Sequence, residues 1–165
     1  MAALDVSTLA PSFTLPTVQG KQFSLDEALN KGPVVLAFFK TSCPVCQYAF
    51  PFIERVYRAN QDANVTVLGI SQDNLRDTQA FLREYGVTSP VALDDQAKYA
   101  VSNAYGLTNV PTLFYIAAGG EIEISSVGWS KADVEAINQK LAQHREQAPN
   151  PLWHKGEDIQ DFRAG

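Results

Sequence analysis

The feature that most constrains the fold is a continuous apolar run, Val34–Phe39, that leads within a few residues to the chain's only two cysteines, Cys43 and Cys46. Such a run, rich in β-forming residues, is typical of a central strand that is covered on both faces. Pro44 suits the first turn of a helix, and apolar residues recur with helical spacing from there to about Ala59. The sequence therefore places both cysteines where a buried strand gives way to an amphipathic helix.

The other predicted elements alternate between strands and helices. Further strands are predicted at 65–70, 91–93, 112–116 and 121–124, and further helices at about 74–85, at 96–105 and from Ser130 onward. A hairpin is predicted within 11–25, and a second one turns at Gly119-Gly120. This order predicts an α/β fold with a central sheet that is parallel in part, is flanked by helices and gains an antiparallel edge from the closing hairpin.

The length of 165 residues, with 45% hydrophobic side chains, suits one globular domain. Residues 1–147 are interpreted as that domain. Residues 148–165 contain two prolines and show no periodicity, which is typical of an extended arm or a disordered end. Because a large aromatic side chain is costly to expose, we expect residues around Leu152 and Trp153 to dock onto this domain or onto a second subunit.

Charge and hydropathy argue against several classes of partner. The chain has 13 Lys and Arg against 18 Asp and Glu, a net charge of −5, and no basic cluster that would bind nucleic acid or an anionic membrane. Its longest apolar run is too short to span a bilayer, and its first residues lack the pattern of a signal peptide. A cytoplasmic location is expected, although a mature periplasmic or extracytoplasmic domain behind a new Met1 would look the same.

Two cysteines at this spacing can form a redox dithiol, half of a metal site or a structural staple. A staple here would close too small a loop to restrict the unfolded chain much. A metal site needs about four ligands, and only His144 and His154 could join the cysteines. A redox dithiol is therefore favoured, with no metal and no cofactor besides a redox-active Cys43–Cys46 disulfide. At the helix N-terminus Cys43 suits the attacking thiolate, and Cys46, one turn further, suits the resolving thiol.

The chain resembles the thioredoxin fold, and more closely the TlpA/ResA-like thiol:disulfide oxidoreductases grouped with the AhpC/TSA redoxins. The resemblance covers roughly Ala10 to Ala142 and rests on the segments Ala10–Leu15, Phe38-Phe39, Phe50-Pro51, Val67–Ser71, Leu93-Asp94, Tyr105–Leu107, Val110–Thr112 and Gly120–Ile122. It implies a thioredoxin-like fold with an N-terminal β-hairpin and an inserted helix. It also implies thiol-disulfide exchange with protein or small thiol substrates, an electron donor, and a monomer or weak dimer.

The same resemblance implies roles for residues around the cysteines. The Val110–Pro111 peptide bond should be cis, Pro111 should lie beside the sulfurs, and the backbone of Val110 should pair with a substrate polypeptide. Pro44 and Val45 lie between the cysteines and should tune the reduction potential. Ser42, a further candidate substrate contact, stands where thioredoxins usually carry Trp.

Two buried acids of the better-known relatives are replaced in this chain. Ala37 occupies the position of the proton-transferring Asp of thioredoxin, and Ala49 that of the Glu found in ResA-type proteins. No side-chain base can therefore be assigned to Cys46 from the sequence, which leaves Lys40 and water as candidates.

Two other functions fit the same scaffold. Peroxiredoxins carry Pro-x-x-x-Thr-x-x-Cys, but with Cys46 in the peroxidatic position the Thr falls on Cys43 and the Pro on Phe39. Both departures count against peroxide reduction as the main activity. A polypeptide-binding module with weak redox activity, using the groove at Val110 and Pro111, is the third possibility.

Overall fold

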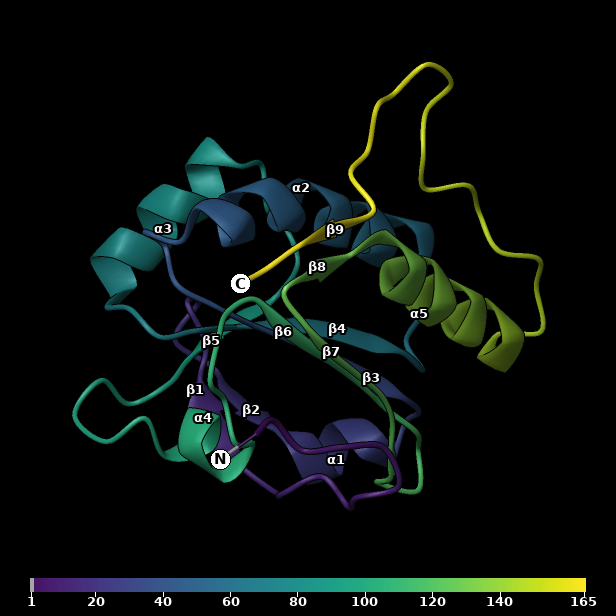
Figure 1. The fold of residues 1–165 in the computed structure, drawn as a ribbon. Coiled ribbons are helices and arrows are strands. Elements are labelled where there is room, and N and C mark those ends of the chain that lie inside the picture. The colour runs from purple at the N-terminus through teal and green to yellow at the C-terminus, as the bar shows by residue number, and fades with distance from the viewer. Residues whose placement is uncertain (1) are drawn as a thin grey trace.

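The computed structural model describes residues 2–165, and a five-stranded mixed sheet runs through its centre (Figure 1). The strands, in spatial order, are β5 (Val91–Leu93), β4 (Thr66–Ser71), β3 (Val34–Phe39), β6 (Thr112–Ile116) and β7 (Ile122–Val127). The central strand β3 pairs in parallel with β4 and antiparallel with β6, and β7 closes the predicted hairpin with β6. The mixed sheet expected from the sequence is confirmed.

Side-chain alternation along β3 divides the apolar residues between two cores. Val35, Ala37 and Phe39 belong to the first core, whereas Val34, Leu36 and Phe38 belong to the second, because successive residues of a strand point to opposite faces. All six side chains are buried, which explains why this strand lacks polar residues altogether.

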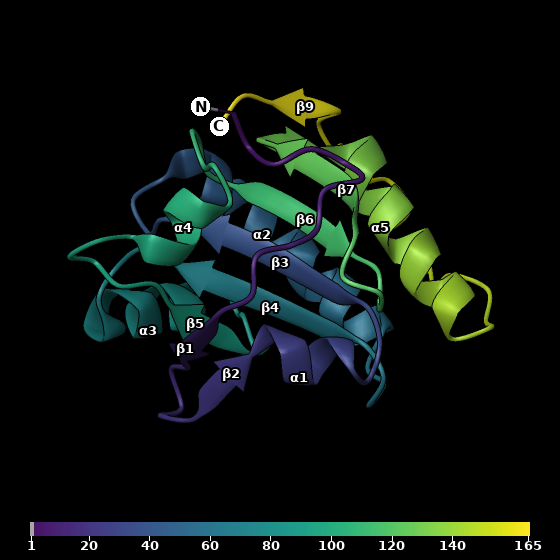
Figure 2. The same cartoon turned by 90° about the horizontal axis from the view of Figure 1, so that it is seen from below.

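Helices cover both faces of the sheet (Figures 1 and 2). The first core lies under the longer helices, α2 (Pro44–Ala59), α3 (Leu75–Glu84) and α5 (Lys131–His144). The second core lies under α1 (Leu25–Leu29), α4 (Ala100–Ala104) and the predicted N-terminal hairpin of β1 (Thr14–Pro16) and β2 (Gln22–Ser24). Within residues 2–165, no helix combines the length and the apolar composition needed to cross a bilayer.

The predicted helix at 96–105 is wrong in length. Tyr99 has a left-handed backbone, with φ at +48°, so α4 begins only at Ala100. The buried carboxylate of Asp94 then fixes the start of the helix, because it accepts hydrogen bonds from the backbone N–H groups of Val101 and Ser102 at 3.3 and 2.8 Å. The start of α5 is as predicted, with the Ser130 hydroxyl accepting from the N–H of Asp133.

The C-terminal segment is an arm packed on the domain rather than a disordered end. Leu152 and Ile159 are buried in the first core, and Trp153 packs on it with ring centroids 5.7 Å from Phe52 and 6.3 Å from Trp129. The docking expected for Leu152 and Trp153 is thus found, and it is on the chain's own domain. The arm ends in a short strand, β9 (Phe162–Arg163), which pairs antiparallel with β8 (Trp129–Ser130).

Candidate active site

Cys43 is the N-cap residue of α2. Its Sγ atom accepts a hydrogen bond from the backbone N–H of Cys46 at 3.2 Å, and its carbonyl accepts the first helical bond, from Gln47, at 3.0 Å. Pro44 follows at the first helical position, where a missing N–H costs nothing. The half-buried sulfur therefore lies at the positive end of the helix dipole with a backbone donor pointing at it.

Cys46 lies in a different environment. Its side chain is fully buried, and it is not joined to Cys43 by a disulfide in this structure. Burial, followed by the contact with the Cys43 sulfur, raises the pKa of the Cys46 thiol well above its ordinary value, and a hydrogen bond with the Lys40 backbone opposes this shift only in part. Cys46 is therefore a protonated thiol at neutral pH.

The loop before β6 brings Val110 to the cysteines. The Val110–Pro111 peptide bond is cis, as the resemblance implies, and the Cys43 thiol donates to the Val110 carbonyl at an Sγ–O distance of 3.5 Å. Two bonds hold the loop: the Thr112 hydroxyl donates to the Asn109 carbonyl at 2.7 Å, and the N–H of Gly128 donates to the Pro111 carbonyl at 2.8 Å. Among residues 2–165, nothing accepts a hydrogen bond from the N–H of Val110.

Asp73 is a site residue that sequence reasoning missed. Asn74 is the N-cap of α3, and the carboxylate of Asp73 beside it accepts a hydrogen bond from the N–H of Thr41 at 2.7 Å. Burial and the contact with Cys43 raise the pKa of Cys46 most, and the negative charge of Asp73 raises it further by a smaller amount. Asp73 directly follows β4, which lies parallel and adjacent to β3. Because the ends of neighbouring parallel strands lie side by side, its position after β4 could have indicated that Asp73 lies near the cysteines.

The other site residues predicted from the sequence lie around the two cysteines and differ in solvent exposure. Ser42 and Pro44 are exposed, Val45 and Val110 are half-buried, and Pro111 is buried. Lys40 is an exposed side chain whose Nζ atom lies 6.0 Å from the centre of the Tyr99 ring. Ala37 and Ala49, the two positions where the resemblance implies an acid in relatives, are fully buried.

In the part of the chain that the structure describes, the charged side chains do not gather into a metal site. Within residues 2–165, no three His, Cys, Asp or Glu side chains are grouped so that they could hold an ion. His154 lies on the arm, with its Nδ1 atom 3.4 Å from Glu157, and His144 lies at the end of α5.

Known proteins are similar to this chain in sequence. The AhpC/TSA family model matches residues 6–125. Thiol-disulfide oxidoreductase ResA of Geobacillus thermodenitrificans is 30% identical over 135 residues, which cover 81% of this chain and 76% of that protein. ResA of Halalkalibacterium halodurans is 30% identical over 134 residues, which cover 80% of this chain and 74% of that protein.

Solved structures are similar over nearly their whole length. A thiol:disulfide interchange protein of the thioredoxin family from Chlorobium tepidum superposes with a TM-score of 0.69 at 29% identity, covering 84% of this chain and 99% of that chain. The thioredoxin domain of a thiol-disulfide oxidoreductase from Bacteroides vulgatus gives a TM-score of 0.74 at 21% identity, covering 84% and 98%. The similarity to the Bacteroides vulgatus domain shows that this chain has the thioredoxin-like fold.

Proposed function

This chain belongs to the AhpC/TSA family and is a thiol-disulfide oxidoreductase, and we propose that Cys43 is its attacking thiolate and Cys46 its resolving thiol. The observation that carries these roles is the contrast between the two sulfurs. Cys43 is half-buried at the start of α2 with a backbone N–H directed at it, whereas Cys46 is fully buried and its pKa is raised. An attacking sulfur needs access and stabilised charge, and a resolving sulfur needs neither before the second step.

In the reducing direction, the Cys43 thiolate attacks one sulfur of a substrate disulfide. A bond forms between that sulfur and Cys43 while the substrate S–S bond breaks, and the departing thiolate takes a proton from solvent. Cys46 then loses its proton and attacks Cys43, which closes the Cys43–Cys46 disulfide and releases the second substrate thiolate. The substrate gains the electron pair that the dithiol loses, and a dithiol electron donor restores the reduced pair.

The substrates we propose are disulfides, including those of polypeptides that lie against Val110. Its carbonyl is 3.5 Å from the Cys43 sulfur, and its N–H is free of partners in residues 2–165. Unpaired main chain beside a reactive sulfur suits an extended polypeptide, which can pair with it as an added strand. Exposed Ser42 and Pro44, half-buried Val45 and buried Pro111 would border the bound segment.

The two thiols are proposed as the whole redox group, so that no bound cofactor takes part. An electron donor, a cytoplasmic location and a monomer or weak dimer stay predictions from the sequence. A reducing compartment would keep Cys43 ready to attack.

Trapping of the mixed disulfide tests the roles of the two cysteines. With reduced protein and an excess of a disulfide-bonded peptide, Cys46→Ser should accumulate a mixed disulfide on Cys43, because nothing resolves it. Cys43→Ser should accumulate none. Non-reducing mass spectrometry reads both outcomes, and a mixed disulfide on Cys46 in the Cys43→Ser protein, with none in the other variant, would reverse the assignment.

Two further measurements fix the direction and test the rival activity. A reduction potential of about −270 mV for the Cys43–Cys46 pair indicates a reductase, and one of about −120 mV indicates an oxidant. In a peroxide-consumption assay we expect no consumption above that of the Cys43→Ser protein. Consumption that depends on Cys46 alone would favour the peroxiredoxin alternative.

A further inference from the structure

The end of the C-terminal arm lies on the main chain beside the active site. Arg163 and Phe162 of β9 pair with Trp129 and Ser130 of β8, which brings the last residues over the loop before β6 (Figures 1 and 2). The side-chain amide of Asn109 donates to the carbonyl of Gly165 at 2.9 Å.

The contact with Val110 is close enough to exclude any side chain at Gly165. A Cβ atom at Gly165 would lie 2.5 Å from the Val110 carbonyl oxygen, which is below any real contact distance. The same carbonyl receives the Cys43 thiol at 3.5 Å. On the other side, a Cβ atom at Gly128 would lie 2.5 Å from the Arg163 carbonyl oxygen. The arm therefore passes tightly between Gly128 and Val110.

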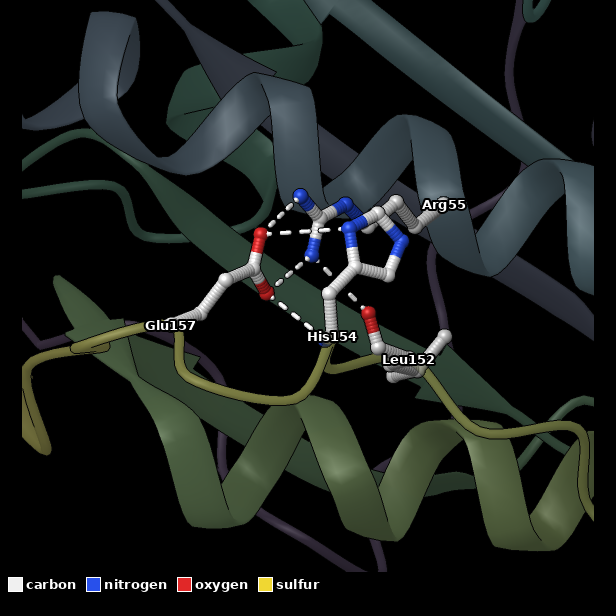
Figure 3. Close-up of polar contacts among 4 residues, drawn as sticks. All are labelled: Arg55, Leu152, His154 and Glu157. Atoms are coloured by element: carbon white, nitrogen blue, oxygen red, sulfur yellow. Dashed lines mark hydrogen bonds and ion pairs between the residues drawn. The ribbon is translucent and has the colours of Figure 1, made fainter.

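The part of the arm before this contact is anchored firmly on α2. Arg55 donates two hydrogen bonds to the Glu157 carboxylate at 2.8 and 2.6 Å and a third to the Leu152 carbonyl at 2.9 Å (Figure 3). Further along, the indole N–H of Trp129 donates to the Gln160 carbonyl at 2.6 Å, and the buried side chain of Ile159 joins the first core.

The last residues are held by much less. Phe162 is 62% exposed, and Ala164 and Gly165 are also exposed. Beyond the short pairing of β8 with β9, this end is held by a hydrogen bond from the N–H of Lys131 to the Asp161 carbonyl at 2.9 Å, by the Asn109 bond, and by the Arg163 guanidinium 4.8 Å from the centre of the Tyr48 ring. Weakly held main chain next to a firm anchor can lift away while the rest of the arm stays in place.

Val110 also borders a surface hollow of about 190 Å³, lined by Lys40, Gln72, Leu107, Thr108, Asn109 and Val110. This is smaller than the roughly 300 Å³ or more of sites that enclose drug-sized ligands. A hollow of this size suits one end of a small disulfide better than a longer polypeptide segment.

From this arrangement, and resting on the proposed function, we propose that residues 161–165 are a specificity-determining segment that competes with polypeptide substrates for the main chain at Val110. A protein disulfide reacts with Cys43 after the arm end has lifted. A small disulfide reaches the sulfur with the arm in place. Only molecules with a lifted arm can react with a protein disulfide, so the apparent rate constant is the intrinsic rate constant multiplied by the fraction of such molecules.

Removal of the segment tests this selectivity. The reduced full chain and a chain that ends after Gln160, which keeps Ile159 and the Trp129 bond, are mixed with insulin or with glutathione disulfide. Oxidation of the cysteine pair is followed by acid quench, alkylation and mass spectrometry. We expect the rate constant with insulin to rise about tenfold on truncation, equivalent to about 1.4 kcal/mol, and that with glutathione disulfide to change less than about twofold.

A single methyl group provides a second variant that keeps the whole chain. Gly165→Ala should displace the arm end from Val110 and raise the insulin rate in the same direction as truncation. Gly119→Ala is the matched control, because a Cβ atom there meets nothing within 4 Å.

The outcomes separate the arm from the chemistry. Equal changes with both disulfides, or an unchanged insulin rate in both variants, would overturn the role of the arm and leave the dithiol chemistry standing. Failure of both disulfides to oxidise the pair in every variant would overturn the proposed function itself, and the arm's role with it.

Discussion

The Sγ atom of Cys43 lies 3.2 Å from the backbone nitrogen of Cys46 and accepts its hydrogen bond. One helical turn thus holds the proposed resolving residue against the proposed attacking sulfur before any disulfide forms. The geometry follows from the N-cap position, whose side chain normally accepts from the residue three positions on. Here a sulfur takes the place of the usual hydroxyl or carboxylate oxygen, so the same contact that begins α2 also organises the redox pair.

This asymmetry predicts the order in which the cysteines are alkylated. With limiting iodoacetamide at neutral pH, Cys43 should be modified at least about tenfold faster than Cys46, because Cys46 is fully buried and its pKa is raised. Peptide mapping by mass spectrometry gives the two rates. Chain unfolded in guanidinium chloride serves as the control and should lose the preference. Equal rates in the folded protein would contradict the assigned roles.

Asp73 should slow the resolving step. Burial and the Cys43 contact dominate the raised pKa of Cys46, and the Asp73 charge adds to them. Asp73→Asn removes that charge while keeping an acceptor for the Thr41 N–H. Cys46 should then lose its proton more readily and attack a mixed disulfide on Cys43 faster, by less than about tenfold.

An aromatic disulfide such as Ellman's reagent measures this step. It releases one coloured thiolate when Cys43 attacks and a second one when Cys46 resolves the mixed disulfide, so the rate of the second phase is the rate of resolution. Asp62→Asn is the control, since Asp62 precedes β4 at the end of the sheet away from the cysteines. A slower second phase in Asp73→Asn would mean that Asp73 accepts the Cys46 proton, which is the opposite of the expected effect.

Glu54 should stabilise the helix that carries the cysteines. Its buried carboxylate accepts from the N–H groups of Thr88 and Ser89 at 2.9 and 3.0 Å and from Arg58 at 2.8 Å. Burial alone would raise the pKa of Glu54, but the hydrogen bonds from Thr88 and Arg58 outweigh it and lower the pKa below its ordinary value. The carboxylate therefore contributes stability above about pH 4.5, and this contribution is lost as the pH falls further.

Denaturant unfolding at pH 7 measures the contribution of Glu54. Glu54→Gln should reduce the free energy of unfolding by about 1–3 kcal/mol, because it leaves buried donors poorly paired. Arg58→Gln is the matched variant and should cost less than about 1 kcal/mol, because its side chain is 60% exposed. Equal losses would show that the ion pair, rather than the buried N–H groups, is the source of the stability.

Much of the site could be predicted from short-range patterns. The apolar run of β3 and the helical spacing of α2 place Cys43 at a strand-to-helix junction, and the structure begins α2 at Pro44 as expected. Such features depend on neighbours in sequence, where hydrophobic periodicity and capping chemistry are local.

What could not be predicted depends on contacts between distant segments. Gly165 reaches Val110 across 55 positions of sequence, and the pattern of residues 148–165 gives no sign of it. Asp73 contacts Thr41, which follows a different strand, so its place at the site cannot be predicted from its neighbours in sequence. The shortened α4 likewise depends on the buried Asp94 carboxylate and the left-handed Tyr99.

The anchor of the arm should weaken in acid. The hydrogen bonds from Arg55 are the main cause that lowers the pKa of Glu157 to about 2, from an ordinary value of 4.5 (Figure 3). Since the folded-state pKa is depressed, the contribution of this anchor is fully present above about pH 4.5 and is lost as the pH falls toward 2. Hydrogen-exchange protection of residues 152–165, corrected for intrinsic rates, should fall through that window. Glu157→Gln should already show weak protection at pH 7 and little further change in acid. If the unmodified arm kept its protection at pH 2 while Glu157→Gln had lost none at pH 7, the buried Leu152 and Ile159 side chains, not the ion pair, would hold the arm.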